Sequence, residues 1–502
     1  MMDLLNNLAF GLSVAATPQN ILLCLIGALV GTLIGVLPGI GPVATIAMLL
    51  PITYGLPPVG ALIMLAGIYY GAMYGGSTTA ILVNIPGESA SVVTTLDGHQ
   101  MALQGRAGPA LAIAAIGSFF AGCVATVVIA AAAAPLTSIA LLFGPAEYFS
   151  LMVLGLIFAV VLAKGSVVKA ISMILFGLVL SMIGSDLETG AGRLNFNIPE
   201  LADGVGFVVI AMGVFGFAEV LRNLEVTHSR DVVNAKITGL MPTREDLKQA
   251  APAVARGTIL GSILGILPGG GSVIAAFAAY TLEKKLAKDP RRFGRGAIEG
   301  VAGPETANNA ASQTSFIPLL TLGIPPNPVM ALMVGAMTIH GIVPGPQVMT
   351  KQPDLFWGMI ASMWFGNLML LVINLPLVGL WVRLLRVPYR MLYPMILIFC
   401  CIGVYSVNNA PADVFMTAAF ALVGYWLVKH DFEPAPMLLG FVLGPLMEEN
   451  LRRAMLIARG DWTVFLTRPI SGALLALSAF LLVIALLPMI RKKRDEVFVE
   501  EG

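Results

Sequence analysis

Two glycine-rich sequences interrupt long apolar stretches of the chain, and both could bind small ions. They are Val36-Leu-Pro-Gly-Ile-Gly41 and Ile266-Leu-Pro-Gly-Gly-Gly271. A helix that begins after such a break presents free N–H groups and a partial positive charge, which suit a carboxylate. The carbonyl groups before the break are freed as well, and they suit a small cation. We therefore expect substrate contacts from Gly39, Gly41, Gly269, Gly271 and Ser272, and cation contacts from Val36, Leu37, Ile266 and Leu267.

The residues next to each break favour a new helix start. Pro42 suits the first turn of the helix after the first break, and Ser272 could cap the helix after the second. In a membrane, broken backbone is tolerated only inside protein or beside water. The alternative to an ion site is a kink that serves helix packing alone.

Polar but mostly uncharged side chains follow each break. Hydroxyls and amides offer donors and acceptors without the cost of a buried charge. We expect the following to complete a substrate site: Ser77, Thr78, Thr79, Asn84, Ser312, Gln313 and Thr314. Because small residues also let helices approach closely, packing is the alternative explanation.

One acidic residue lies in the second of these polar stretches. Glu305, Asn308 and Asn309 are spaced i, i+3 and i+4, so they share one face of a helix. We expect these three residues to take part in ion coupling. For Glu305, a position at a helix start directly after Pro304 is the alternative.

Several function classes lack their usual sequence signals. The chain has no G-x-x-x-x-G-K-[ST] sequence for ATP hydrolysis. It has neither H-E-x-x-H nor G-x-S-x-G, and its four cysteines have no metal-binding spacing. We therefore expect no enzyme and no cofactor. A channel and an intramembrane enzyme remain weaker alternatives to a carrier.

The elements that hold these residues are predicted to be transmembrane helices. Of the 502 residues 57% are hydrophobic and 11% are charged, against about 25% charged in an ordinary globular protein. Many apolar stretches approach the roughly 20 residues that a crossing needs. We predict an all-α polytopic membrane protein with about 11 or 12 crossings. Since no Lys or Arg precedes Arg106, we expect the first apolar segment to be retained rather than cleaved.

An internal repeat divides the chain. The sequence from Gly31 to Gly41 matches that from Gly261 to Gly271, and Glu219-Val-Leu-Arg222 matches Glu449-Asn-Leu-Arg452 at the same offset of 230. We predict one repeat at 11–228, a cytoplasmic linker at 229–240, a second repeat at 241–458 and an extra C-terminal helix at 470–490.

The placement of basic residues predicts that the repeats are inverted. Basic residues flank the second broken segment, about 257–282, on both sides, whereas the first, about 20–56, has none on either side. By the positive-inside rule, both ends of the second segment are cytoplasmic and both ends of the first are external. Each segment is then a re-entrant hairpin, and five crossings connect them, near 58–85, 109–132, 146–163, 167–184 and 203–221.

Four arginines of the C-terminal region depart from this rule. Arg452, Arg453, Arg459 and Arg468 would be external, against the rule. Either the 434–449 segment does not cross the membrane, or pairing with Glu448, Glu449 and Asp461 weakens the signal.

Four motifs closely resemble the large membrane subunit of the tripartite tricarboxylate transporter (TctA) family. They are Gly35-Val-Leu-Pro-Gly-Ile-Gly-Pro42, Tyr70-Gly-Ala-Met-Tyr-Gly-Gly-Ser-Thr-Thr-Ala80, Ile85-Pro-Gly-Glu88 and Gly303-Pro-Glu-Thr-Ala-Asn-Asn-Ala310. The resemblance implies a bacterial inner-membrane system that imports tricarboxylates or related organic acids with a gradient of Na⁺ or H⁺. It also implies two partners, a small membrane subunit and a periplasmic substrate-binding protein. At Pro325-Pro326 the second half departs from the Ile-Pro-Gly of the first.

Overall fold

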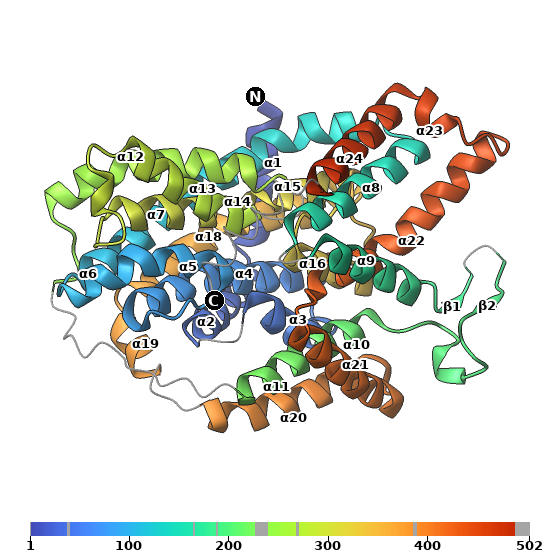
Figure 1. The fold of residues 1–502 in the computed structure, drawn as a ribbon, viewed down its shortest axis with the longest axis horizontal. Coiled ribbons are helices and arrows are strands. Elements are labelled where there is room, and N and C mark those ends of the chain that lie inside the picture. Colours follow the sequence, from blue (N-terminus) through green and yellow to red (C-terminus); the bar gives the residue numbers. More distant parts are fainter. Residues whose placement is uncertain are drawn as a thin grey trace.

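The computed structural model describes residues 2–37, 41–163, 166–186, 189–225, 239–267, 271–384 and 389–486. The predicted site residues Gly39 and Gly269 lie outside these ranges. So does the predicted linker, apart from its last two residues. Within the described residues the fold is almost wholly helical (Figure 1), and one short antiparallel pair of strands joins Gly184 to Arg193 and Ser185 to Gly192.

The first half of the chain follows the predicted order of helices closely. Each of the five predicted crossings corresponds to a helix or to a run of helices, the last being the run α10–η4–α11. The elements are α1 (Met2–Ala15), α2 (Pro18–Val36), α3 (Pro42–Thr53), α4 (Pro58–Val83), η1 (Ser89–Ser91), α5 (Val92–Thr94), η2 (Thr95–His99), α6 (Gln100–Leu103), α7 (Ala107–Ala140), α8 (Pro145–Leu162), α9 (Val167–Ser181), β1 (Gly184–Ser185), β2 (Gly192–Arg193), η3 (Pro199–Leu201), α10 (Phe207–Ala211), η4 (Met212–Phe217) and α11 (Ala218–Glu225).

The second half begins with another broken pair of helices and ends with the predicted extra helix, α24. Its elements are α12 (Arg244–Leu264), α13 (Gly271–Leu286), η5 (Pro290–Arg292), α14 (Glu299–Thr314), α15 (Phe316–Leu322), α16 (Pro328–Ile339), α17 (Gln347–Lys351), α18 (Pro353–Asn374), α19 (Val378–Leu384), α20 (Tyr389–Asn408), α21 (Pro411–Lys429), α22 (Pro434–Ile457), α23 (Val464–Thr467) and α24 (Pro469–Leu486).

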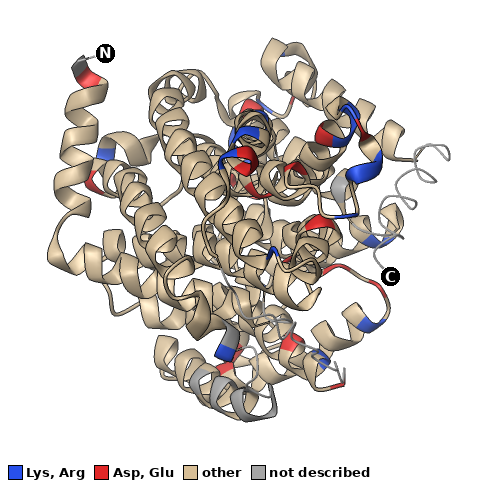
Figure 2. Cartoon of the chain, turned by 90° about the vertical axis from the view of Figure 1, so that its left-hand side faces the viewer, with Lys and Arg blue, Asp and Glu red and all other residues tan. Residues whose placement is uncertain are grey.

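The helices have the composition of membrane spans. Among the described residues, seven helices are long and apolar enough to cross a bilayer, and shorter apolar helices accompany them. Charged residues are sparse over the ribbon (Figure 2). The chain is therefore an all-α polytopic membrane protein, as predicted, whereas the count of 11 or 12 crossings stays a prediction.

The helices that precede the two breaks pack in the same way. A Cβ atom at Gly31 would lie 2.4 Å from the carbonyl oxygen of Ile68, so α2 and α4 touch through their backbones. A Cβ atom at Gly261 would lie 2.3 Å from the carbonyl oxygen of Ala307, which brings α12 equally close to α14. Such close approach needs glycine. The shared packing supports the internal repeat, and the inverted arrangement stays a prediction.

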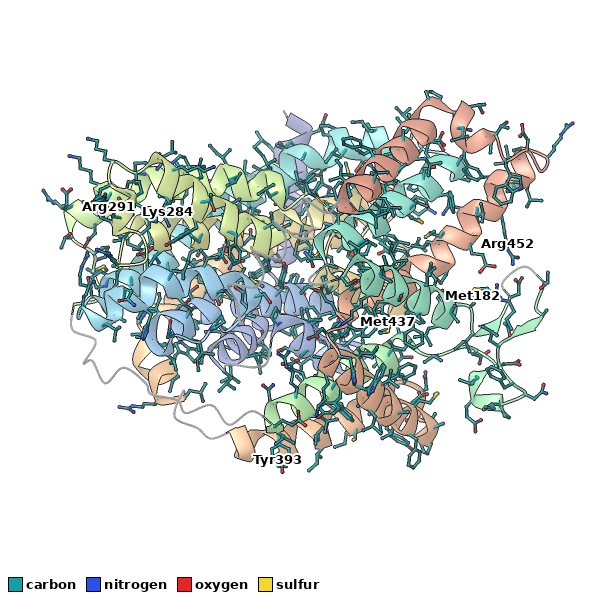
Figure 3. All side chains as sticks on the ribbon, in the orientation of Figure 1. Met182, Lys284, Arg291, Tyr393, Met437 and Arg452 are labelled. Carbon is teal, nitrogen blue, oxygen red and sulfur yellow. The ribbon has the colours of Figure 1, made fainter. Side chains whose placement is uncertain are left out.

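Basic residues of α13 and η5 lie far from those of the C-terminal region. Lys284 and Arg291 are near one end of the long axis, and Arg452 is near the other (Figure 3). Two of the four C-terminal arginines pair with glutamates of the predicted set, Arg452 with Glu448 at 2.6 Å and Arg453 with Glu449 at 2.5 Å. The side of the membrane on which these arginines lie stays a prediction. Asp461, in contrast, accepts hydrogen bonds from Thr463.

A buried carboxylate ties the first half to the second. Asp97, in η2, has no exposed surface, and its Oδ1 accepts hydrogen bonds from four successive backbone N–H groups of the loop before α14. Its Oδ2 accepts from the Tyr280 hydroxyl at 3.0 Å. The loop donors are the N–H groups of Gly294, Arg295, Gly296 and Ala297. Asp97 thus fixes the start of α14 against the segment after α4.

We expect Asp97→Ala to destabilise the protein by about 3–5 kcal/mol, because hydrogen bonds to a charged group are strong and their donors would be left unpaired. Asp97→Asn keeps one acceptor oxygen and should cost less. Thermal unfolding of the purified protein in detergent measures both effects. Equal unfolding temperatures for Asp97→Ala and wild type would show that this contact does not hold the halves together.

Candidate functional site

Two buried carboxyl groups lie where α4, α14 and the segment after α4 meet. Glu305 is 1% exposed, and its Oε2 accepts a hydrogen bond from the Ser77 hydroxyl at 2.5 Å. Its Oε1 accepts a hydrogen bond from the Thr94 hydroxyl. Because α14 begins at Glu299, Glu305 lies inside the helix and not at its start. The site therefore joins residues that are more than 200 positions apart in the sequence.

The second carboxyl group belongs to Glu88, which the sequence reasoning did not place in the site. Glu88 is 8% exposed and accepts hydrogen bonds from the backbone N–H of Ala90 at 2.6 Å and the amide of Asn308 at 3.2 Å. Asn308 lies one helical turn after Glu305, and the two carboxyl groups interact electrostatically. Among the described residues, neither carboxyl group has a Lys, Arg or His partner within 4.0 Å.

A sequence signal could have found Glu88. No acidic or basic residue occurs between Asp3 and Glu88, and Glu88 directly follows Ile85-Pro-Gly87. An acid that ends so long an uncharged stretch is a candidate for function, because charges in such surroundings are costly.

The first break is held by hydroxyl contacts. Helix α2 ends at Val36, whose carbonyl oxygen accepts a hydrogen bond from the Thr79 hydroxyl at 2.8 Å. Val36 and Leu37 are both buried. Helix α3 begins at Pro42 with Gly41 as its N-cap, and a Cβ atom at Gly41 would meet nothing within 4 Å. A side chain at Gly41 would therefore begin in open space.

Polar groups from both halves lie near the start of α13. Helix α13 begins at Gly271, so Ser272 is its second residue and not its cap. The hydroxyl of Tyr69, on α4, lies within interaction distance of Ser272, Ser315 and Asn327. The Asn327 Nδ2 is buried without a hydrogen-bond partner. Before this break Ile266 is partly buried, and Leu267 is 44% exposed.

Glu88 and Asn327 occupy equivalent places in the two halves. Each follows an Ile-Pro turn that begins with a left-handed residue, Asn84 with φ 58° in the first half and Gly323 with φ 74° in the second. Each also caps the next helical turn with its own side chain and has φ −152°. The two turns therefore have the same backbone conformation. The position of the acid Glu88 in the first turn is taken by the amide Asn327 in the second.

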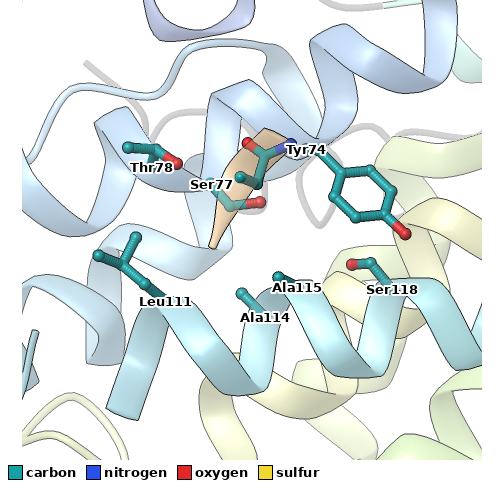
Figure 4. A pocket seen from close by; sticks show the side chains of 8 residues that line it. Tyr74, Ser77, Thr78, Leu111, Ala114, Ala115 and Ser118 are labelled. Atoms are coloured by element: carbon teal, nitrogen blue, oxygen red, sulfur yellow. The ribbon is translucent and has the colours of Figure 1, made fainter. Parts of the chain in front are cut away.

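A small cavity is lined in part by Ser77, the hydrogen-bond partner of Glu305 (Figure 4). Its volume is about 10 Å³, which is the space that one water molecule needs. Tyr74 and Asn374 line it, and the Tyr74 hydroxyl and the Asn374 Oδ1 have no hydrogen-bond partner. Its lining residues are Tyr74, Ser77, Thr78, Leu111, Ala114, Ala115, Ser118 and Asn374.

The remaining predicted residues have other contacts. Gln313 donates to Asn367 on α18 at 2.9 Å and accepts from Thr126 on α7 at 3.1 Å. Ser312 and Thr314 donate to carbonyl groups of their own helix, and Asn84 is an exposed helix end. Asn309 donates to Ser118 on α7 at 2.8 Å. The structure thus brings Ser77, Thr78, Glu305 and Asn308 together, whereas Gln313 and Asn309 face α7 and α18.

Comparison with known proteins identifies the family to which the chain belongs. The sequence profile described as the tripartite tricarboxylate transporter TctA family matches residues 21–439. An uncharacterised 52.8 kDa protein of Agrobacterium vitis, from the TAR-I ttuC' 3' region, is 61% identical over 501 residues and covers the whole of both chains. A second uncharacterised A. vitis protein, from the TAR-II ttuC' 3' region, is 64% identical over 241 residues, which is 48% of this chain and all of that protein. No solved structure matches. The chain belongs to the TctA family, the large subunits of tripartite tricarboxylate transporters.

Proposed function

We propose that this chain is the permease of a binding-protein-dependent secondary transporter that imports tricarboxylates or related organic acids across a bacterial inner membrane. The observation that carries the proposal is the family match over residues 21–439, which include both breaks and the carboxyl cluster. A small membrane subunit and a periplasmic substrate-binding protein are its expected partners.

The substrate is proposed to bind between the two breaks. The starts of α3 and α13 supply N–H groups, and hydroxyl and amide groups near them supply neutral donors. Among the buried residues that the structure describes there is no Lys or Arg. Neutral donors can hold an anion without a permanently buried cation, which would be costly in the empty carrier, and they also release it readily.

Two inverted repeats are the proposed basis of alternating access, as in many secondary transporters. The matched glycine contacts of α2 with α4 and of α12 with α14 support the repeat. The proposal allows either Na⁺ or H⁺ as the coupling ion. Glu305, Asn308 and Asn309 are proposed to lie near that ion.

Addition of the binding protein is the test of this function. The chain with its small partner subunit, reconstituted in vesicles, should take up radiolabelled citrate slowly. Addition of the matching periplasmic binding protein should raise the uptake rate at least about tenfold, because the binding protein delivers the substrate and preorganises the site that receives it. Full uptake without the binding protein would instead indicate an autonomous ion-coupled carboxylate carrier.

A further inference from the structure

Glu88 and Glu305 form a buried acidic pair whose neighbours are neutral donors. Ser77 and Thr94 donate to Glu305, whereas Asn308 and the backbone of Ala90 donate to Glu88. Burial of one ionised carboxyl group is costly, and burial of two that repel each other is costlier still. Without a cation to compensate them, one of the two is therefore expected to carry a proton.

The charged groups on neighbouring elements are committed elsewhere. On α13, Glu283 forms two hydrogen bonds with Arg256, at 2.6 and 2.7 Å. Asp97 is held by backbone N–H groups and Tyr280. The titratable hydroxyl of Tyr69 interacts electrostatically with Glu88, and that of Tyr74 with Glu305. None of these groups brings a positive charge to the pair.

The neighbours of the pair suit both the charged and the neutral form of a carboxyl group. Hydroxyl groups such as those of Ser77 and Thr94 can donate to a carboxylate or accept from a carboxylic acid. Asn308 offers the same choice to Glu88, since its Oδ1 is buried without a partner and a turn of the amide would present it to a protonated Glu88. The side chains around the pair can therefore form hydrogen bonds with either form of the carboxyl group.

A route for the proton adjoins the pair. Ser77 bonds Glu305 and also lines the water-sized cavity, where the hydroxyls of Tyr74 and Ser118 and the Oδ1 of Asn374 are further polar groups. One water there would have several partners, which is the usual setting of a buried water. A proton could pass from such a water through the Ser77 hydroxyl to Glu305 Oε2.

We propose that Glu88 and Glu305 hold one exchangeable proton between them, and that this proton is one of the cations coupled to transport. The claim that the pair binds a proton does not rest on the proposed function, whereas the claim of coupling does. The two parts need separate measurements.

Infrared spectroscopy tests proton binding on the intact chain in lipid nanodiscs. At neutral pH the wild type should show the carbonyl band of a protonated carboxyl group, and this band should vanish in both Glu88→Gln and Glu305→Gln. Glu283→Gln is a matched control, because Glu283 is buried at 3% exposure but is paired with Arg256, and it should leave the band unchanged. A wild type without the band, or a band that persists in either pair variant, would overturn the proposal.

Transport measurements test coupling with the same variants. In vesicles with the partner subunits, Glu88→Gln and Glu305→Gln should still exchange internal for external citrate but should lose its uphill accumulation in a proton gradient. Glu305→Asp should restore part of the accumulation. Accumulation driven by a Na⁺ gradient alone, without proton uptake, would contradict coupling by this pair. A wild type that transports neither citrate nor any related organic acid would refute the proposed function, and the infrared result would still decide proton binding.

Discussion

Gly31→Leu is expected to abolish the folded protein, or to lower its stability by more than about 3 kcal/mol, because the new side chain would force two helix backbones apart. A Cβ atom at Gly27, Gly31 or Gly35 would lie 2.2 to 2.4 Å from a carbonyl oxygen of α4. These three glycines are spaced four residues apart and so form one continuous face of α2. No rotamer of a larger side chain relieves a clash that begins at Cβ.

The equivalent substitution in the second half of the chain is an independent test. Gly257, Gly261 and Gly265 meet backbone oxygens of α14 at 2.3 to 2.5 Å, so Gly261→Leu should be as damaging as Gly31→Leu. Gly55→Ala is the matched control, since a Cβ atom at Gly55 would meet nothing within 4 Å. Size-exclusion profiles after a heating series measure the stability of all three. A Gly31→Leu protein that melts with wild type would show that α2 and α4 do not need this close contact.

Loss of both ion gradients is expected to remove uphill accumulation of substrate altogether. Import of a trianion against −100 mV costs about 7 kcal/mol, at roughly 2.3 kcal/mol per charge, which corresponds to about a 10⁵-fold concentration ratio. The sequence contains no ATP-binding loop that could supply this energy. Co-transport of at least three monovalent cations is needed before the membrane potential stops opposing the import of a trianion.

The helices could be predicted from sequence because hydropathy and the proline and glycine positions determine their limits. The predicted crossing at 146–163 corresponds to α8 at Pro145–Leu162, and that at 167–184 to α9 at Val167–Ser181. The predicted span at 109–132 is part of a longer helix, α7, which runs from Ala107 to Ala140 through Pro135. A proline is tolerated there because neighbouring helices can satisfy the freed backbone groups.

The carboxyl cluster was only half predictable. Glu305 and Asn308 stood out because polar residues recurred on one helical face. Their partner Glu88 follows a turn, where no periodicity indicates which way a side chain points. The role of Asp97 could not be predicted for a related reason. Asp97 accepts hydrogen bonds from backbone N–H groups of a loop almost 200 residues away, and backbone donors have no sequence signature.

The direction in which a polar side chain of a helix points could not be predicted from the sequence either. Gln313 follows Asn309 by four residues, and both contact α7, whereas Asn308 contacts Glu88. On a helix that is buried on all sides, every face meets a neighbour, so spacing alone does not separate the faces that line a site from those that pack.

The account as a whole rests on secondary transport of a carboxylate by this subunit and its partners. The most direct test is the inside-to-outside ratio of radiolabelled citrate in vesicles that contain both membrane subunits and the binding protein, measured with Na⁺ and H⁺ gradients present and after both are collapsed. We predict a ratio well above unity that falls to unity after collapse. Accumulation that survives the loss of both gradients would contradict the account.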